Sequence, residues 1–406
     1  MKQQNAARNV WYLGLVSLFT EISSQMIYPF IPQFLVSIGA SKSIIGLVEG
    51  IAEATASLFR TVFGRWSDRV KRRKIFIFCG YGLSALSKPF LYLAQTWTAV
   101  LTVRFSDRMG KAMRNPARDA LISTSISVNR KGRAFGIHRG MDRLGAIGGP
   151  LLALLVLHFF EDNVRWVFLL SVVPGLLALI FIIFAREMRA ATQNALANPG
   201  SGESGNTTGL KQKGFLLFLL ANIVFTLGNS SNAFLILKAH EAGLAVALIP
   251  VIWIVYNLFC TLSSPVFGIV SDRVGRQPVI ASSFLYYAVL YLLFGIAGSV
   301  WQVWALFAAY GIYYGLSEGV LRAYIADLVE EESRSTAYGI FNTGIGIALL
   351  PASVIMGLIW DAFGSRWAFF TSAGFSLAGF FIFLISVHFH RRAGQKYSSQ
   401  ESKAFL

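Results

Sequence analysis

The chain has 406 residues, of which 55% are hydrophobic and 14% charged, and its mean hydropathy is +0.57. This balance excludes a water-soluble domain of the same length, because such domains carry about 25% charged residues. The formal net charge of +16 does not indicate nucleic-acid binding, since the basic residues lie in short segments between apolar runs, where the positive-inside rule places them. The composition predicts an all-α integral membrane protein.

Apolar runs of about 20 residues, the length that crosses a hydrocarbon core of about 30 Å, recur along nearly the whole chain. The first run follows a short basic start and is too long for the core of a signal peptide. Both cysteines, Cys79 and Cys260, lie inside apolar runs, so neither a disulfide framework nor a thiolate metal site is expected. We expect twelve transmembrane helices, at residues 10–38, 43–66, 75–95, 98–126, 134–160, 165–185, 214–238, 244–270, 278–298, 300–327, 335–360 and 366–388.

The order of these runs predicts two six-helix bundles. The expected domains are an N-terminal bundle at 1–189, a flexible cytoplasmic linker at 190–213, a C-terminal bundle at 214–390 and a cytoplasmic tail at 391–406. Both termini are expected on the cytoplasmic side, because the opposite side carries few basic residues. Those few are Lys42, Arg165, Lys238 and Arg366.

An internal repeat at an offset of about 204 residues supports the division into two bundles. The pattern Val-Phe-Gly-x-x-x-Asp-Arg-Val occurs at 62–70 and again at 266–274. The triplet Ser-Ser-Gln at 23–25 returns as Ser-Ser-Asn at 230–232. Two homologous bundles related by a pseudo-two-fold axis are therefore expected.

The repeated element resembles the signature loop of the major facilitator superfamily. Its residues here are Gly64, Asp68, Arg69 and Arg72 between helices 2 and 3, echoed by Gly268, Asp272 and Arg273. The resemblance covers essentially the whole chain. It implies the family's twelve-helix fold, secondary transport by alternating access, and a gating role for this loop. A loop that only anchors the topology is the alternative.

The predicted helix 5 is similar to the antiporter motif of the same family. The matching residues are Gly136, Gly145, Gly149 and Pro150, and the closing Gly-Gly pair of the motif is Ala-Leu here. This similarity implies an exporter. Arg104 matches the family's helix-4 arginine, which is associated with proton coupling, although it is followed by an Asp-Arg pair rather than by a polar or glycine-rich stretch.

Charged residues inside the predicted helices are concentrated in the first half, which holds seventeen of twenty-two. An unpaired charge near the membrane centre costs about 2.5–3.5 kcal/mol, so these groups must pair or line water. Basic residues on helix 4 recur at steps of three and four, which places them on one helix face, and the carboxylates of helices 1 and 2 are their expected partners. The candidates for proton coupling are Glu21, Glu49, Glu53, Arg104, Asp107, Arg108 and Lys111.

The alternative for these charges is a network that only joins helices. We expect this joining role for the charges nearer the cytoplasm, and we expect Lys88 to extend toward the membrane interface. The charges assigned to joining helices are Asp107, Arg114, Asp119, Arg139, Asp142 and Arg143.

Helices 1 and 7 carry the matched polar triplets at the depth where the family places its substrate. The expected solute contacts are Ser23, Ser24, Gln25, Asn229, Ser230 and Asn232, together with Glu318 and Arg322 on helix 10. Polar groups between helices also stabilise packing by about 0.6–1.7 kcal/mol each, which is the alternative role. Tyr310, Tyr313 and Tyr314 could face either a cavity or lipid, since periodicity does not distinguish the two.

The sequence therefore predicts a multi-pass transporter of the inner (cytoplasmic) membrane that exports a small anionic or zwitterionic organic solute in exchange for protons. Alternatives are a proton symporter importing an organic anion or siderophore-like metal chelate, a non-transporting receptor, and an integral membrane enzyme acting on lipids. The last lacks support, since no metal signature, nucleophile elbow or glycine-rich phosphate loop occurs. Expected partners are the solute, protons and membrane lipids, with no cofactor, metal or nucleic acid, and we expect a functional monomer.

Overall fold

The computed structural model describes residues 2–70, 72–125, 131–185, 187, 213–329 and 333–404, with side chains omitted at 2–7, 131–133, 213, 335 and 390–404. The expected linker, apart from residue 213, lies outside the described residues. The helices of the first half are α1 (Lys2–Ile27), α2 (Ile31–Ser37), α3 (Lys42–Val70), α4 (Arg73–Ser87), α5 (Trp97–Ser125), α6 (Lys131–Phe159), α7 (Val164–Leu170) and α8 (Val172–Phe184). Those of the second half are α9 (Lys213–Gly228), α10 (Ala233–Glu241), α11 (Ile249–Val274), α12 (Arg276–Ile296), α13 (Val300–Leu328), α14 (Arg334–Phe363) and α15 (Ser365–Ala404).

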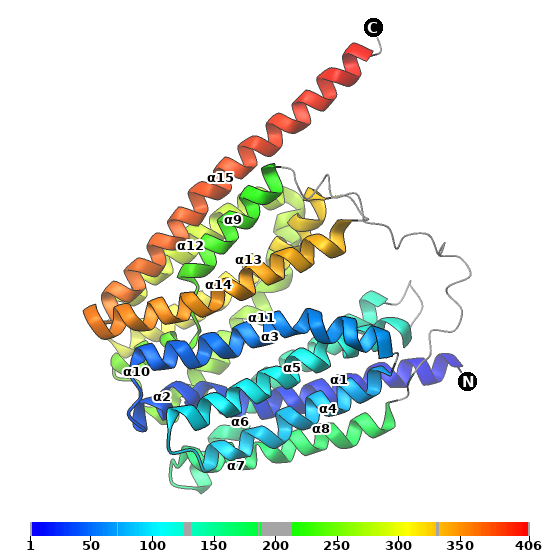
Figure 1. Ribbon diagram of the computed structural model, residues 1–406. Coiled ribbons are helices and arrows are strands. Elements are labelled where there is room, and N and C mark those ends of the chain that lie inside the picture. The colour runs from blue at the N-terminus through cyan, green and yellow to red at the C-terminus, as the bar shows by residue number, and fades with distance from the viewer. Residues whose placement is uncertain are drawn as a thin grey trace.

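These helices cross the molecule twelve times, as the sequence predicts. Figure 1 shows α1 to α8 in one group and α9, α12, α13, α14 and α15 in a second group above it. We call the side on which α1 and α9 begin the inner side, which the charge distribution predicts to be cytoplasmic, and the opposite side the outer side. The last helix extends beyond its expected end, to Ala404.

Several crossings that the sequence predicts as single helices are interrupted. The first crossing contains a 3-10 turn at Tyr28–Phe30, with a proline at its second position, two residues after the end of α1. The seventh crossing breaks between Gly228 and Ala233. Proline lacks an N–H group and stops the helical hydrogen-bond ladder, and residues 229–232 combine four polar side chains that compete for backbone hydrogen bonds. Both breaks place irregular backbone inside the protein.

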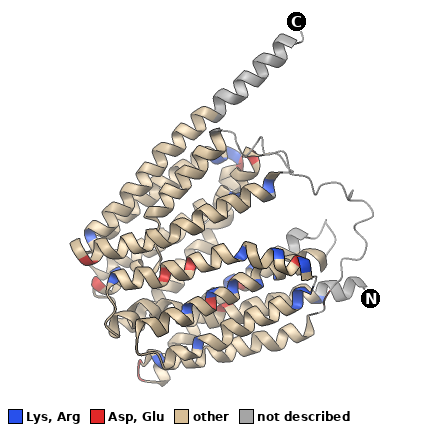
Figure 2. Ribbon diagram, viewed as in Figure 1, with Lys and Arg blue, Asp and Glu red and all other residues tan. Residues whose placement is uncertain are grey.

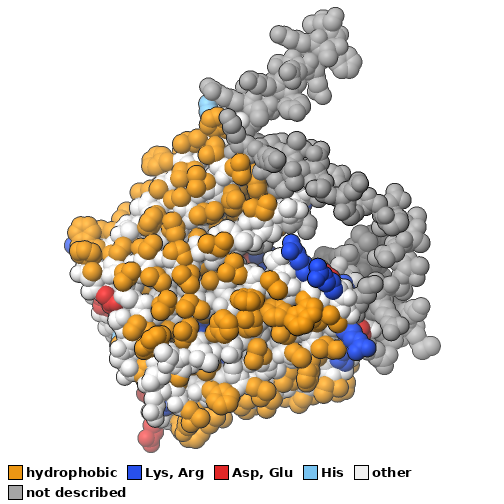
Figure 3. Space-filling view, viewed as in Figure 1, with side chains coloured by type: hydrophobic (Ala, Val, Ile, Leu, Met, Phe, Trp, Pro, Cys, Tyr) orange, Lys and Arg blue, Asp and Glu red, His pale blue; other side chains and the backbone are white. Residues whose placement is uncertain are grey.

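The exterior is apolar. Figure 3 shows hydrophobic side chains across the broad face of both groups, which is the surface expected against lipid. Among the described residues, eight spans are long and apolar enough to cross a membrane by length and composition alone. The other four crossings begin with α1, α3, α5 and α13, which carry the polar and charged residues considered below.

The interiors of the two groups differ in chemistry. In Figure 2 the charged positions on the helices lie mainly in the lower group, whereas the upper group is nearly free of charge between its ends. The second half instead buries stacked aromatic rings, such as Tyr287 on Tyr291 with centroids 4.0 Å apart. Tyr310 and Tyr313 belong to this cluster and are buried, so they face neither an open cavity nor lipid.

The segment predicted as a gating loop is largely helical. Gly64, Asp68 and Arg69 occupy the last turns of α3, and α4 begins only three residues after α3 ends. The corresponding residues of the second half lie in α11, which runs to Val274. The point at which the sequence turns polar marks the edge of the membrane and not the end of the helix. Helical backbone hydrogen bonds do not require apolar surroundings, so the helices continue past that point.

Candidate functional site

The centre of the first half contains a buried bidentate ion pair between α3 and α5. Arg104 donates from Nε to Glu49 Oε1 at 3.0 Å and from Nη2 to Oε2 at 2.6 Å. Both side chains are at most 3% exposed. The guanidinium also lies 5.5 Å from the centre of the Tyr28 ring, in the break of the first crossing. With two charge-assisted bonds and no water access, this pair is held in one geometry.

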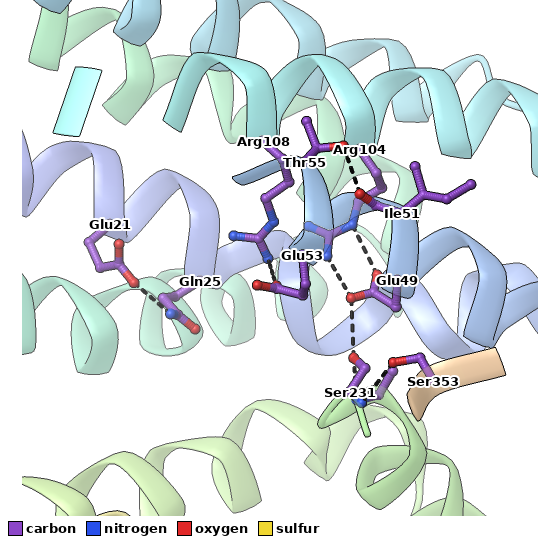
Figure 4. Close-up of polar contacts among 11 residues, drawn as sticks. Glu21, Gln25, Glu49, Ile51, Glu53, Thr55, Arg104, Arg108, Ser231 and Ser353 are labelled. Carbon is purple, nitrogen blue, oxygen red and sulfur yellow. Dashed lines mark hydrogen bonds and ion pairs between the residues drawn. The ribbon is translucent and has the colours of Figure 1, made fainter. Parts of the chain in front are cut away.

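One helical turn farther along both helices lies a second pair that water can reach. Arg108 Nη2 is 2.7 Å from Glu53 Oε1, and the side chains are 11% and 34% exposed. Counting about 1.5 Å per residue, Glu53 lies about 5 Å from the midpoint of α3. Figure 4 shows the two pairs side by side between α3 and α5. Glu53 is therefore a carboxylate near mid-membrane with one charged partner and an exposed edge.

A third buried charge pair involves Lys88, which corrects the expectation that it extends to the interface. Its side chain is 1% exposed, and Nζ donates to Ser24 Oγ at 2.8 Å and to Ser23 Oγ at 3.1 Å. Asp107 Oδ1 lies 3.9 Å from Nζ and accepts a hydrogen bond from Ser84. The backbone explains the burial, because η2 (Lys88–Tyr92) continues α4 inside the bundle. Asp107 thus connects α5 to α4 and η2, which agrees with its predicted role in joining helices; its other predicted role, in proton coupling, stays a prediction.

Glu21 is linked to the second half through two hydrogen bonds. Gln25 Nε2 donates to Glu21 Oε1 at 2.6 Å, and Trp253 Nε1 on α11 donates to Gln25 Oε1 at 2.7 Å. The predicted helix-5 glycines bring α6 against this region. A Cβ on Gly145 would lie 2.6 Å from the Leu18 carbonyl oxygen on α1, so the two helices touch through their backbones.

Glu49 also reaches the second half. Ser231, in the break between α9 and α10, donates from Oγ to Glu49 Oε2 at 3.3 Å, and its N–H donates to Ser353 Oγ at 3.2 Å. Figure 4 shows this contact below the Glu49–Arg104 pair. Each half thus sends one side chain of its second crossing, Glu49 or Trp253, to the interrupted first crossing of the other half.

The predicted solute contacts mostly have partners within the protein. Asn229 and Asn232 accept hydrogen bonds from Tyr287 and Tyr310, at 3.4 and 2.8 Å. Ser23 donates to the Ser171 carbonyl at 2.7 Å. The Ser230 hydroxyl is buried with no hydrogen-bond partner in the described part of the chain. These geometries are those of helix packing, and solute contact remains a prediction for this set.

The two halves are joined firmly on the outer side. The Asp361 carboxylate at the end of α14 accepts the backbone N–H groups of Lys42 and Ser43 at 3.0 and 2.7 Å and also the Ser43 hydroxyl. A carboxylate at this position satisfies free N–H groups and the positive end of the α3 dipole. The first half therefore begins α3 on a cap supplied by the second half.

Small residues let α3 and α14 touch through their backbones below this cap. A Cβ on Gly46 would lie 2.8 Å from the Ser353 carbonyl carbon, and a Cβ on Gly50 would lie 3.0 Å from the Leu350 backbone. The contact extends inward to Ser57, whose hydroxyl donates to the Asn342 carbonyl at 3.1 Å.

On the inner side the predicted gating residues do not reach the other half within the described structure. Asp68, 66% exposed, lies 3.5 Å from Arg73 of its own half. Gly268 and Gly339 have open space where a Cβ would stand. The exposed residues of this set are Asp68, Arg69, Arg72, Asp272 and Arg273. The structure is closed outside and open inside.

The opening contains a cavity of about 660 Å³ between α6, α11 and α13. Glu318 faces Arg143 of the first half at 3.5 Å and Arg139 at 3.9 Å, and its own helix adds Arg322 at 3.4 Å. Figure 3 shows the hollow between the two groups, with basic side chains of the inner part of α3 at its edge. Arg139 and Arg143 therefore lie between the two halves, rather than joining helices of the first half as the sequence suggested. The sequence signal for a shared partner was the four-residue spacing of Arg139 and Arg143, which places both on one face of α6.

Other predicted site residues make fewer contacts or serve helix packing. The Lys111 ammonium has no hydrogen bond or ion pair to the described residues, and Gly136 has open space at its Cβ position. Gly149 packs on α1, where a Cβ would meet the Ile22 carbonyl oxygen at 2.7 Å, and Pro150 follows it inside α6. The main functional contact that sequence analysis missed is the capping of α3 by Asp361, because Asp361 does not belong to any recognisable sequence motif.

Twelve helical crossings in two pseudo-symmetric groups, with an apolar exterior and polar groups between the halves, define a multi-span membrane protein. The model of the Major Facilitator Superfamily matches residues 13–227 and 217–405, and the chain belongs to this family of transporters. It is 36% identical over 362 residues to an uncharacterized MFS-type transporter of Methanocaldococcus jannaschii, covering 87% of this chain and 89% of the relative.

Two further matches show the range of similar proteins. The multidrug resistance protein MdtG of Serratia proteamaculans is 34% identical over 130 residues, which is 32% of this chain and 31% of that protein. The crystal structure of the nucleoside transporter NupG (D323A mutant) superposes with a TM-score of 0.76 at 15% identity, covering 93% of this chain and 99% of that one. The second match shows the fold alone.

Proposed function

We propose that the protein is a proton-coupled secondary transporter that exports a small organic solute by alternating access. The Glu53–Arg108 pair carries this proposal, since it places a partly exposed carboxylate near mid-membrane on a helix that also packs against the second half. Protonation of Glu53 would weaken its bond to Arg108 and change the charge of the helix that the second half must release. Glu49, fully buried and bidentate, is the structural member of the two pairs.

Export is supported by the helix-5 motif and by the partial similarity to a multidrug resistance protein. The proposed moving units are residues 1–189 and 214–390, which rock about the contacts between α3 and α14. We propose that the chain acts as a monomer in the cytoplasmic membrane, with anionic lipids held by the basic inner segment. We propose neither a catalytic reaction nor a cofactor for it.

A second candidate is proton symport that imports an organic anion. The three arginines around Glu318 in the inner cavity supply more positive than negative charge, which suits the organic anion of this candidate but does not set the direction of transport. Proteoliposomes loaded with a pH-sensitive dye and challenged with organic anions, zwitterions and lipophilic cations separate the candidates. Protons and solute moving in opposite directions support antiport, movement in the same direction supports symport, and solute movement without protons contradicts both.

Replacing Glu53 with glutamine should abolish proton movement while solute still crosses down its own gradient. Glutamine keeps the size of the side chain but cannot exchange a proton, and the position is exposed enough for folding to survive. Dye fluorescence and solute flux are measured on the same vesicles, with Glu161→Gln on the outer surface as the matched control. Normal proton-coupled transport by Glu53→Gln would assign coupling to another group.

Replacing Asp68 with asparagine should slow turnover several-fold without weakening solute binding. The family's gating role requires Asp68 in the access state opposite to the present one. In the present state the ion pair that Asp68 makes among the described residues is exposed and contributes about 0–1 kcal/mol. Stopped-flow exchange rates and equilibrium binding are compared with those of Asp162→Asn, a surface control. An unchanged exchange rate would leave the segment as a topology anchor only.

A further inference from the structure

The cavity between α6 and α13 has a surplus of positive charge that the protein itself does not neutralise. Arg139, Arg143 and Arg322 converge on the single carboxylate of Glu318, which leaves two positive charges uncompensated in this cluster. The nitrogen-to-oxygen distances are 3.4–3.9 Å. Strong charge-assisted bonds are about 2.7–2.9 Å long, so Glu318 holds its three partners loosely.

The guanidinium groups also retain free donors. Each arginine has five N–H groups, and within the described part of the chain the one other partner of Arg143 is Cys260 Sγ at 3.3 Å, a weak acceptor. The side chains of Arg139 and Arg322 are 62% and 55% exposed. These donors therefore face the open cavity and are available to a ligand.

The remaining walls are mostly apolar, and the hydroxyls of Thr261 and Ser264 on α11 donate to backbone carbonyls of their own helix. Leu144 and Ile147 line the cavity from α6, one and four residues beyond Arg143, and Gly140 and Gly319 leave its sides open. A volume of about 660 Å³ falls within the usual range of about 300–1,000 Å³ for small-molecule sites. The lining suits a molecule with an anionic group and an apolar body.

The position of the cavity fits a transported ligand. Arg143 lies two residues from the midpoint of α6 and Glu318 four residues from the midpoint of α13, or about 3 and 6 Å at 1.5 Å per residue. Because the two helices belong to opposite halves, a ligand bound here touches both moving units.

We propose that this cavity binds an organic anion with an apolar body, and that Glu318 is the resident counter-ion which the anion displaces from the arginines. The inference rests on the proposed transport function and names its substrate class. The effect of removing the Glu318 charge distinguishes a cluster that only joins the two halves from one in which a bound anion displaces Glu318. Removing the Glu318 charge strengthens anion binding if the two compete for the same donors, and has no such effect if the cluster only joins the halves.

The test uses three probes with one ring system and different charge, namely 2-naphthoate, 2-naphthamide and 2-naphthylmethylammonium. Radiolabelled probe binding is measured on the full chain in phosphatidylcholine nanodiscs. We expect 2-naphthoate to bind about tenfold more tightly than the amide or the cation. Arg143→Gln should lower naphthoate affinity about tenfold and leave amide binding unchanged, whereas Glu318→Gln should raise naphthoate affinity several-fold.

Arg366→Gln, an arginine at the outer end of α15, is the matched control and should change nothing. Equal affinity for the three probes, or unchanged or weaker naphthoate binding in Glu318→Gln, would overturn the proposal. Nanodiscs containing phosphatidylglycerol identify the natural source of the anion. Unchanged naphthoate binding assigns the site to a soluble anion, and suppressed binding assigns it to a lipid headgroup of the same chemistry.

The outcome is independent of proton coupling. Arginine-dependent naphthoate binding together with solute flux that moves no protons would reject the coupling proposal and retain the anion site. Proton-coupled transport confined to neutral or cationic solutes would reject the anion site and retain the coupling proposal.

Discussion

Gly46→Ala should drive the transporter out of the outward-closed state described here. The added Cβ would stand 2.8 Å from the Ser353 carbonyl carbon and closer still to its oxygen, so α3 and α14 must separate. Overpacking of this kind costs about 1–3 kcal/mol, which changes the ratio of the two access states by roughly 5- to 150-fold. Double electron–electron resonance between labels at the outer ends of α3 and α14 should show longer distances.

Gly374→Ala is the matched control, because its Cβ position has open space and the glycine also lies inside a helix. Alanine favours a helix over glycine by about 1 kcal/mol, so neither variant should lose its fold through backbone propensity. A Gly46→Ala distance distribution identical to that of the control would show that this backbone contact does not hold the outer side closed.

Removing Glu49 should have the largest effect on stability of any single change considered. Glu49→Ala leaves Arg104 charged and buried without a counter-ion, which costs about 3–5 kcal/mol. Reversible unfolding in mixed detergent micelles measures this loss. The double variant Glu49→Gln/Arg104→Gln should recover much of it, since a neutral pair of similar size removes the buried charge altogether.

Glu318→Gln provides the comparison for an exposed pair. Its carboxylate is 37% exposed and its partners are loosely held, so the expected loss is about 0–1 kcal/mol. If Glu49→Ala is no more destabilising than Glu318→Gln, the Glu49–Arg104 pair is not a structural element, and its role would have to be sought in transport.

Much of the fold could be predicted because hydropathy directly reports which segments avoid water. The sequence predicts helices at 98–126 and 300–327. In the structure α5 begins and ends one residue earlier than predicted, and α13 begins at the predicted residue and ends one residue later. The breaks at Tyr28–Phe30 and at 229–232 were missed, because an average over about 20 residues hides a short polar interruption. They are nevertheless the positions where each half meets the other.

For the candidate site, the set of charged residues could be predicted but not every pairing. Glu49 and Glu53 on α3 and Arg104 and Arg108 on α5 share a spacing of four, and both helices run from the outer to the inner side. Equal spacing on parallel helices is what allows two pairs one turn apart. The lateral packing that buries Lys88 depends on contacts distant in the sequence, which periodicity does not contain.

The two crossings between the halves have a consequence for the history of the chain. Glu49 and Trp253 occupy equivalent places in the repeat, and each binds the interrupted first crossing of the other half. If the repeat arose by duplication of a six-helix unit, an ancestral homodimer would have made one contact twice. Here one copy is a carboxylate and the other an indole, so only one of the two contacts carries a formal negative charge, and the molecule has an electrostatic asymmetry that a symmetric dimer could not possess.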